Sequence, residues 1–249
     1  MKIDKVVMAC DDNPLFLDFW PIVSKLWQVI FDIEPILLYF GDNPNISTKY
    51  GSIKHFHCEQ EDKYLYTLWS RYWYPQNEHD KTFIISDIDM LPCSKFYFID
   101  LLRPIPDDTY VHLTAHCKPL PSCYHIAKGK KFEKVLKLPA DLDECVQLAK
   151  SVKSISHELE NGLHATHWGG DEFYADKCVM EFQNTNPEEV FLYKRNPALK
   201  RIDRSCWHQK PAKWNGMEIY DCHSLRPYGH NKESIDSITD KIMKVNGYE

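Results

Sequence analysis

The distribution of apolar and polar residues in the first part of the chain predicts strands followed by helices. An apolar run over residues 5–10 is typical of a strand, and residues 15–30 are dense in apolar side chains, as in a helix that covers a sheet. Asn13 can cap this helix, whereas Pro21 lies inside it and should kink it or split it in two. A second strand is expected over residues 35–40.

The same alternation continues along the chain. A helix over residues 61–74 places apolar side chains at the i, i+3, i+4 and i+7 spacing of one buried face. The unbroken apolar run over residues 81–86 is typical of a strand buried on both faces. Further strands are expected over residues 110–116, 123–127, 190–193 and 218–220, further helices over 141–159, 171–182 and from about 232, and a loop over 166–170.

Such alternation predicts an α/β protein with a mostly parallel central sheet flanked by helices. The 249 residues are enough for one large domain and do not require two. We see no repeat, low-complexity segment or clear linker that would divide the chain. A single α/β domain is therefore expected.

Composition and charge exclude several classes of function. The formal net charge is −6, so the basic surface expected of a nucleic-acid binder is missing. No stretch approaches the ~20 apolar residues of a membrane span, and the first residues lack the pattern of a secretory signal. Nine cysteines without regular spacing fit reduced thiols. We therefore expect a soluble cytoplasmic protein. Its 7 Trp and 14 Tyr are residues that also line sugar and base pockets.

Candidate chemistry is concentrated at Asp87 and Asp89, directly after the buried strand over residues 81–86. Open α/β sheets bind ligands at the carboxyl ends of their strands. Two carboxylates there are unfavourable unless something positive satisfies them. Mg²⁺ or Mn²⁺ would do so and keep positions open for substrate phosphates. The alternative is that this Asp-x-Asp merely caps a turn, but the apolar strand before it and Met90-Leu91-Pro92 after it favour a functional role.

Residues 83–92, Phe-Ile-Ile-Ser-Asp-Ile-Asp-Met-Leu-Pro, resemble the metal-binding segment of GT-A glycosyltransferases. Residues 9–14, followed by a helix, resemble the first strand and nucleotide-contacting loop of that family. Arg71, residues 169–172 and residues 221–227 follow in the order that the fold expects. The resemblance spans nearly the whole chain and extends to small glycosyltransferases of large DNA viruses, so a viral protein would work in the host cytoplasm.

The resemblance implies a single GT-A domain over residues 1–249. Residues 1–115 would be the nucleotide-binding half. Residues 116–249 would be the acceptor-side half, ending in a segment that contacts the metal and the diphosphate. The implied activity is the transfer of a sugar from a nucleotide-sugar donor, by family habit a UDP-sugar, to a glycan or another hydroxyl acceptor in glycan biosynthesis.

The resemblance also implies a metal and diphosphate site. Asp87 would contact the metal or the donor ribose, Asp89 would bind the metal directly, and Ile88 lies between them in the donor site. His223 would be a third ligand, which suits Mn²⁺ better than Mg²⁺; the alternative is a surface or capping histidine. Arg226 would grip the diphosphate bidentately, with an exposed salt bridge as its alternative.

Further donor contacts are implied at the end of the first strand and on the helix over residues 61–74. Ala9, Cys10, Asp11 and Asp12 would face the nucleotide. The alternative for either acid is that it assists in capping the following helix. Arg71 would reach the donor, or else extend along its helix towards solvent.

The acceptor side is expected around residues 168–172. Asp171 or Glu172 would act as catalytic carboxylate, deprotonating the acceptor hydroxyl in an inverting reaction. Both acids also suit the first turn of a helix. Trp168 would stack on a sugar face, and Gly169 and Gly170 would allow close approach of the backbone. A retaining enzyme would instead stabilise an oxocarbenium-like centre, and the late histidine weakly favours that outcome.

Three other interpretations remain. Structural zinc is suggested by three histidine–cysteine groups, which lack paired Cys-x-x-Cys spacing: His55-Phe56-His57-Cys58, His116-Cys117 and Cys222-His223. An Asp-nucleophile phosphatase also ends a strand with Asp-x-Asp, but it sets the motif early in the chain. A non-catalytic scaffold that binds sugar nucleotides through a GT-A fold is the third.

Overall fold

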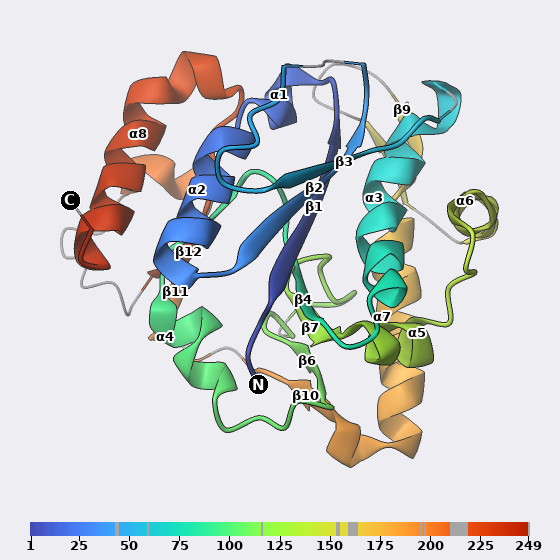
Figure 1. Ribbon diagram of the computed structural model, residues 1–249. Coiled ribbons are helices and arrows are strands. Elements are labelled where there is room, and N and C mark those ends of the chain that lie inside the picture. The colour runs from blue at the N-terminus through green and yellow to red at the C-terminus, as the bar shows by residue number, and fades with distance from the viewer. Residues whose placement is uncertain are drawn as a thin grey trace. The chain divides into compact units, whose positions relative to one another are not determined.

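A computed structural model describes residues 1–42, 45–58, 60–115, 117–152, 155–158, 164–194, 196, 198–209 and 219–248. It is shown as a ribbon in Figure 1. The chain forms two compact units that are interleaved in sequence. Unit 1 comprises residues 1–56, 86–106 and 196–249, and unit 2 comprises residues 57–85 and 107–195. Neither unit is therefore one continuous stretch of chain.

Unit 1 contains three parallel strands in the order of the sequence (Figure 1). These are β1 (Lys5–Asp11), β2 (Glu34–Phe40) and β3 (Ser52–His55). Every residue of β2 after its first is buried, as expected for a parallel strand covered on both faces. The carboxyl end of β1 therefore lies at the same edge as that of its neighbour β2.

The helices of unit 1 are α1 (Pro14–Leu17), α2 (Trp20–Phe31), α4 (Lys95–Phe98) and α8 (Tyr228–Val245), with a 3₁₀ turn η3 over Asp100–Leu102. The predicted helix over 15–30 is thus split just before Pro21, as expected, and the Asn13 side chain accepts a hydrogen bond from the Leu15 N–H at 3.0 Å. The helix α2 packs against β2 and against α8 (Figure 1).

A small second sheet in unit 1 has the strand order β11 (Lys200–Ile202), β12 (Ile219–His223) and β5 (Met90–Pro92). The 3₁₀ helix η5 (Arg204–Gln209) follows β11. Strand β12 runs antiparallel to β5, with His223 opposite Met90. This register places the end of β12 beside the residue that precedes Met90, which is Asp89.

Unit 2 contains strands in the order β10 (Val190–Leu192), β6 (Tyr110–His112), β7 (His125–Lys128) and β4 (Thr82–Ile85). Strand β10 is parallel to β6, whereas β7 is antiparallel to both β6 and β4. All four residues of β4 are buried, as its apolar run predicted. A separate antiparallel pair is formed by β8 (Ile155–Glu158) and β9 (His164–Trp168).

The helices of unit 2 are α3 (Lys63–Trp73), α5 (Gly129–Leu136), α6 (Leu142–Ser151) and α7 (Gly170–Thr185), with 3₁₀ turns η1 (Gln60–Asp62), η2 (Tyr74–Asn77) and η4 (Pro187–Glu189). Among the described residues no helix is long and apolar enough to cross a membrane.

The predicted α/β class, with a mostly parallel sheet flanked by helices, is confirmed, and β7 is its antiparallel exception. The helix expected over 141–159 is too long, since α6 ends at Ser151 and Val152 is already extended. The loop expected over 166–170 is wrong in part, because residues up to Trp168 belong to β9. In both segments the pairing of β8 with β9 outweighs the local preference of the sequence. The assignment of halves at residue 115 stays a prediction.

Candidate active site

Asp87 and Asp89 lie on a tight turn that begins where β4 ends. The Ser86 N–H donates to the Val7 carbonyl at 3.0 Å, and the Met90 N–H donates to the Asp87 carbonyl at 3.2 Å. Ile88 is only 3% exposed and anchors the turn in the core. The Ser224 N–H donates to the Asp89 carbonyl at 2.9 Å, and this hydrogen bond joins the turn to the segment after β12.

The Asp89 carboxylate is surrounded by three basic side chains. Its Oδ2 lies 2.9 Å from Arg204 Nη2, 3.4 Å from Arg226 Nε and 3.6 Å from His223 Nε2. Burial acts to raise the pKa of Asp89, but the hydrogen bond from His223 and the charges of His223 and Arg226 outweigh it and lower the pKa below its usual value. Asp89 is therefore a buried anion.

His223 reaches Asp89 because of the register between β12 and β5. Its Nδ1 lies 3.3 Å from Asp203 Oδ2, an arrangement that orients the ring. Burial acts to lower the pKa of His223, but the hydrogen bond with Asp89 and the charges of Asp89 and Asp87 raise it to about 9. The charge of Arg201 works in the opposite direction, and the Arg204 guanidinium also contacts Nε2.

The donor chemistry of Asp89 and His223 fits a divalent cation such as Mn²⁺. Carboxylate oxygen and imidazole nitrogen both suit this ion, and at 3.6 Å the two atoms are close enough to share one ion. Asp87, the third predicted ligand, is close enough for its charge to raise the pKa of His223. Within the described ranges, no group of three His, Cys, Asp or Glu side chains is arranged to hold a metal. Sites with few protein ligands are usual where substrate phosphates complete the coordination.

Arg226 is fixed between Asp89 and α1. Its guanidinium lies over the Phe16 ring, with Cζ 4.7 Å from the ring centroid, a cation–π contact. Its side chain is only 18% exposed, so an exposed salt bridge does not describe it. Arg204 and Asp203 were not predicted, because a basic and an acidic residue after a short strand carry no motif.

The two acids at the end of β1 have different partners. The Asp11 carboxylate accepts from the Asn13 N–H at 3.0 Å, which supports the capping interpretation for this residue. Asp12 accepts from the Tyr39 hydroxyl and, at 3.1 Å, from the Asp42 N–H. Cys10 is buried, and its pKa is raised well above the usual value, by burial first and then by the charges of Asp11 and Asp12.

Two small residues lie near the acids at the end of β1: Ala9 precedes them in the strand, and Gly41 follows β2. Ala9 is half-buried. A side chain on Gly41 would collide with the Asp12 carboxylate, so the absence of a Cβ there allows the backbone to approach Asp12 closely.

In unit 2, Arg71 and Asp171 form a buried ion pair. Arg71 Nη2 lies 3.4 Å from Asp171 Oδ2, and both side chains are almost inaccessible to solvent. Glu172 accepts a hydrogen bond from the Ser122 N–H at 2.9 Å. Both acids stand in the first turn of α7. The structure therefore brings together Arg71 from the predicted donor site and Asp171 from the predicted acceptor site.

The remaining predicted acceptor residues surround the start of α7. Gly169 has a φ of 73°, a conformation that favours glycine, and Gly170 is buried. Trp168 ends β9, but its side chain lies outside the described residues.

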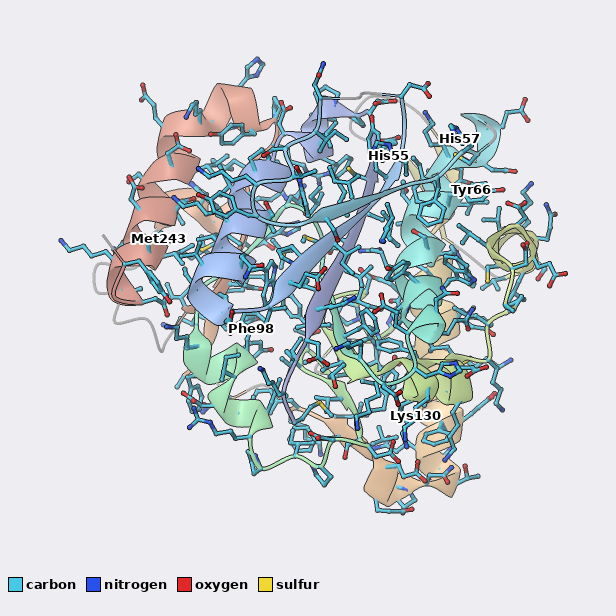
Figure 2. All side chains as sticks on the ribbon, in the orientation of Figure 1. His55, His57, Tyr66, Phe98, Lys130 and Met243 are labelled. Atoms are coloured by element: carbon cyan, nitrogen blue, oxygen red, sulfur yellow. The ribbon has the colours of Figure 1, made fainter. Side chains whose placement is uncertain are left out.

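None of the three suggested zinc groups forms a metal cluster in the part of the chain that the structure describes. His55, labelled in Figure 2, packs edge-on against the Tyr39 ring at a centroid distance of 5.3 Å. Cys222 lies in the core with its Sγ 3.5 Å from that of Cys93. His116 lies outside the described residues.

No family model matches the sequence, and no curated protein matches it. Among solved structures, the chain is similar to the galactosyltransferase LgtC in complex with donor and acceptor sugar analogs, with a TM-score of 0.49, 12% identity and coverage of 98% of this chain and 95% of that chain. An active-site mutant of LgtC gives a TM-score of 0.48 and 13% identity, with 98% of this chain and 95% of that one covered.

A glycosyltransferase involved in the glycosylation of the major capsid of PBCV-1 gives a TM-score of 0.45 and 11% identity, covering 95% of this chain and 99% of that one. All three are glycosyltransferases, the class to which the sequence resemblance pointed. Because the TM-scores are below 0.5, these similarities do not assign an activity to the chain.

Proposed function

We propose that this chain is a metal-dependent glycosyltransferase that transfers a sugar from a UDP-sugar to a glycan or another hydroxyl acceptor. The main support for the proposal is that three basic side chains lie within 4 Å of the Asp89 carboxylate, namely those of Arg204, Arg226 and His223. A buried carboxylate–imidazole pair flanked by guanidinium groups suits a cation together with a diphosphate.

On the donor side, Asp89 and His223 would hold Mn²⁺ or Mg²⁺, and Asp87 would contact the ion or the donor ribose. When bound, the ion supplies Lewis-acid neutralisation of the leaving diphosphate. Arg226 would bind that diphosphate through its planar guanidinium.

The nucleotide itself would lie against the end of β1. Asp12, positioned by Tyr39 and the Asp42 backbone, is the acid there that we assign to the base or the ribose. Ala9, Cys10 and Asp11 would shape the same edge, and Ile88 would fix the turn beside it.

On the acceptor side we retain Asp171 and Glu172 as the candidate carboxylates, with Trp168, Gly169 and Gly170 as candidate acceptor contacts. The buried ion pair supports a positioning role of Arg71 for Asp171. In an inverting reaction one of the two acids would take the proton of the acceptor hydroxyl. In a retaining reaction, which the late histidine weakly favours, the departing diphosphate could take it.

The first test is titration calorimetry of UDP and GDP, with and without Mn²⁺, on the wild-type chain and on Asp89→Asn. UDP should bind with Mn²⁺ and much more weakly without it, and Asp89→Asn should lose the metal dependence while its circular dichroism stays that of the wild type. Unchanged affinity in the variant would rule out the assignment. Metal-dependent binding without turnover on a wide acceptor panel would indicate the non-catalytic scaffold, and absence of binding would favour the phosphatase.

A further inference from the structure

Arg204 contacts both candidate metal ligands through one nitrogen. Its Nη2 lies 2.9 Å from Asp89 Oδ2, across 115 positions of sequence, and it also contacts His223 Nε2. The neighbouring Asp203 holds the other ring nitrogen of His223 at 3.3 Å. One turn at the start of η5 therefore both orients the imidazole and brings a positive charge to the atoms that a metal would bind.

A divalent ion at the proposed site would bind the same Asp89 oxygen that the Arg204 guanidinium contacts. An ion bonded to Asp89 Oδ2 at about 2.1 Å would lie against a guanidinium nitrogen that is 2.9 Å from that oxygen. Arg226 contacts the same oxygen at 3.4 Å, so the ion would meet two positive groups at once. Like charges at such separations repel strongly in a buried site. Binding of the ion alone should therefore be weak while Arg204 stays in place.

The same region offers Arg204 an alternative partner once an anion is present. Among the described residues, Arg204 Nε and Ser224 Oγ are buried atoms without a hydrogen-bond partner, and Arg226 Nε makes no hydrogen bond although it lies 3.4 Å from Asp89 Oδ2. Buried polar groups in this state are costly. Phosphate oxygens would satisfy them, and guanidinium groups bind phosphate in a bidentate manner.

We propose that Arg204 is an internal cation that takes the place of the metal on the Asp89 carboxylate, beside His223, in the nucleotide-free protein, and that it moves to the donor diphosphate when the metal binds. The inference rests on the proposed function and adds a coupling between the two ligands. The diphosphate gives the displaced guanidinium a new partner, so the nucleotide strengthens metal binding, and the metal strengthens nucleotide binding by the same factor.

The experiment measures free Mn²⁺ by electron paramagnetic resonance during titrations of the full chain with and without UDP. The variants are Arg204→Gln, which removes the charge, and Arg204→Lys, which keeps it with a different geometry. Lys200→Gln is the matched control, because it removes one positive charge from an exposed side chain at the start of β11, close by in sequence. Circular dichroism checks that each variant is folded.

Without nucleotide, Arg204→Gln should bind Mn²⁺ about tenfold more tightly than the wild type, which corresponds to ~1.4 kcal/mol. UDP should then increase its Mn²⁺ affinity by a smaller factor than in the wild type. Arg204→Lys should lie between the two, and Lys200→Gln should match the wild type.

Equal or weaker Mn²⁺ binding by Arg204→Gln without UDP would overturn the inference. If Asp89→Asn abolishes Mn²⁺ binding while Arg204→Gln has no effect, the inference fails and the proposed metal site stands. If neither the wild type nor Arg204→Gln binds Mn²⁺, with or without UDP, the proposed metal site fails as well.

Discussion

In the proposed metal site, the imidazole of His223 would make metal binding depend on pH. Its pKa, raised to about 9 by Asp89 and Asp87, means that the ring holds a proton at neutral pH in the metal-free protein. Only the neutral ring can be a ligand. Metal binding at the proposed site would therefore have to release that proton.

We accordingly expect the Mn²⁺ affinity of the nucleotide-free chain to rise as the pH is raised towards 9, by up to about tenfold per unit. Above pH 9 the rise should level off, because the ring is then already neutral. His223→Gln should bind Mn²⁺ more weakly and show a flatter pH profile. A wild-type affinity that is constant between pH 6.5 and 9 would exclude His223 as a ligand.

A second residue-scale prediction concerns Lys131, whose side chain is only 2% exposed. Its ammonium group pairs with Glu189, and Lys134 pairs with the same carboxylate at 2.9 Å. Because removal of one partner leaves a buried charge less well compensated, Glu189→Gln should lower the free energy of unfolding by about 1–3 kcal/mol. Glu181→Gln, in an exposed pair with Lys177, should change it by less than ~0.5 kcal/mol.

The effect of Glu189 should also depend on pH. The hydrogen bonds from Lys131 and Lys134 hold the pKa of Glu189 below its usual value. The stabilisation is therefore present above the unfolded-state pKa and is lost as the pH falls through the lower folded-state pKa. Urea unfolding at pH 7 and at acid pH should show the difference between wild type and Glu189→Gln shrinking towards low pH. A difference that persists at acid pH would show that the charge is not the cause.

At the scale of the element, the junction between β1 and α1 is stabilised by side chains that cap the backbone. The Asn13 side chain accepts from the Leu15 N–H, and Asp11 accepts from the Asn13 N–H. Asn13→Ala should cost about 1 kcal/mol of stability, whereas Asn13→Asp should be nearly neutral, since both residues are good N-caps. Urea denaturation would measure both, and equal losses in the two variants would argue against the cap.

Elements with a strong local pattern were predictable from the sequence. The apolar run of β4, the face of α3 and the break before Pro21 are decided by residues close together in the chain. The segments that were mistaken, after Ser151 and before Gly169, have mixed composition. There, strand pairing between β8 and β9 outweighs local propensity.

At the scale of the whole molecule, the strand pattern named Asp87 and Asp89 as candidates, whereas His223 and Arg226 became candidates only through the family resemblance. Nothing in the local pattern shows that β12 pairs with β5. Arg204 lay beyond prediction for the same reason, because its role follows from the return of η5 to the Asp89 turn. Local pattern predicts elements, whereas sites made by distant segments depend on the register between strands.

That register would also determine which metal ion the proposed site can bind. A slip of one residue between β12 and β5 would place Cys222 or Ser224 opposite Met90 instead of His223. A thiolate there would favour soft ions such as zinc, and a hydroxyl would leave the carboxylate without a nitrogen partner. Two backbone hydrogen bonds at the ends of this strand pair oppose such a slip: the Cys93 N–H donates to the Tyr220 carbonyl and the Ser224 N–H donates to the Asp89 carbonyl, both at 2.9 Å. In the proposed metal site, backbone hydrogen bonds that do not contact the ion would thus determine which ion is bound.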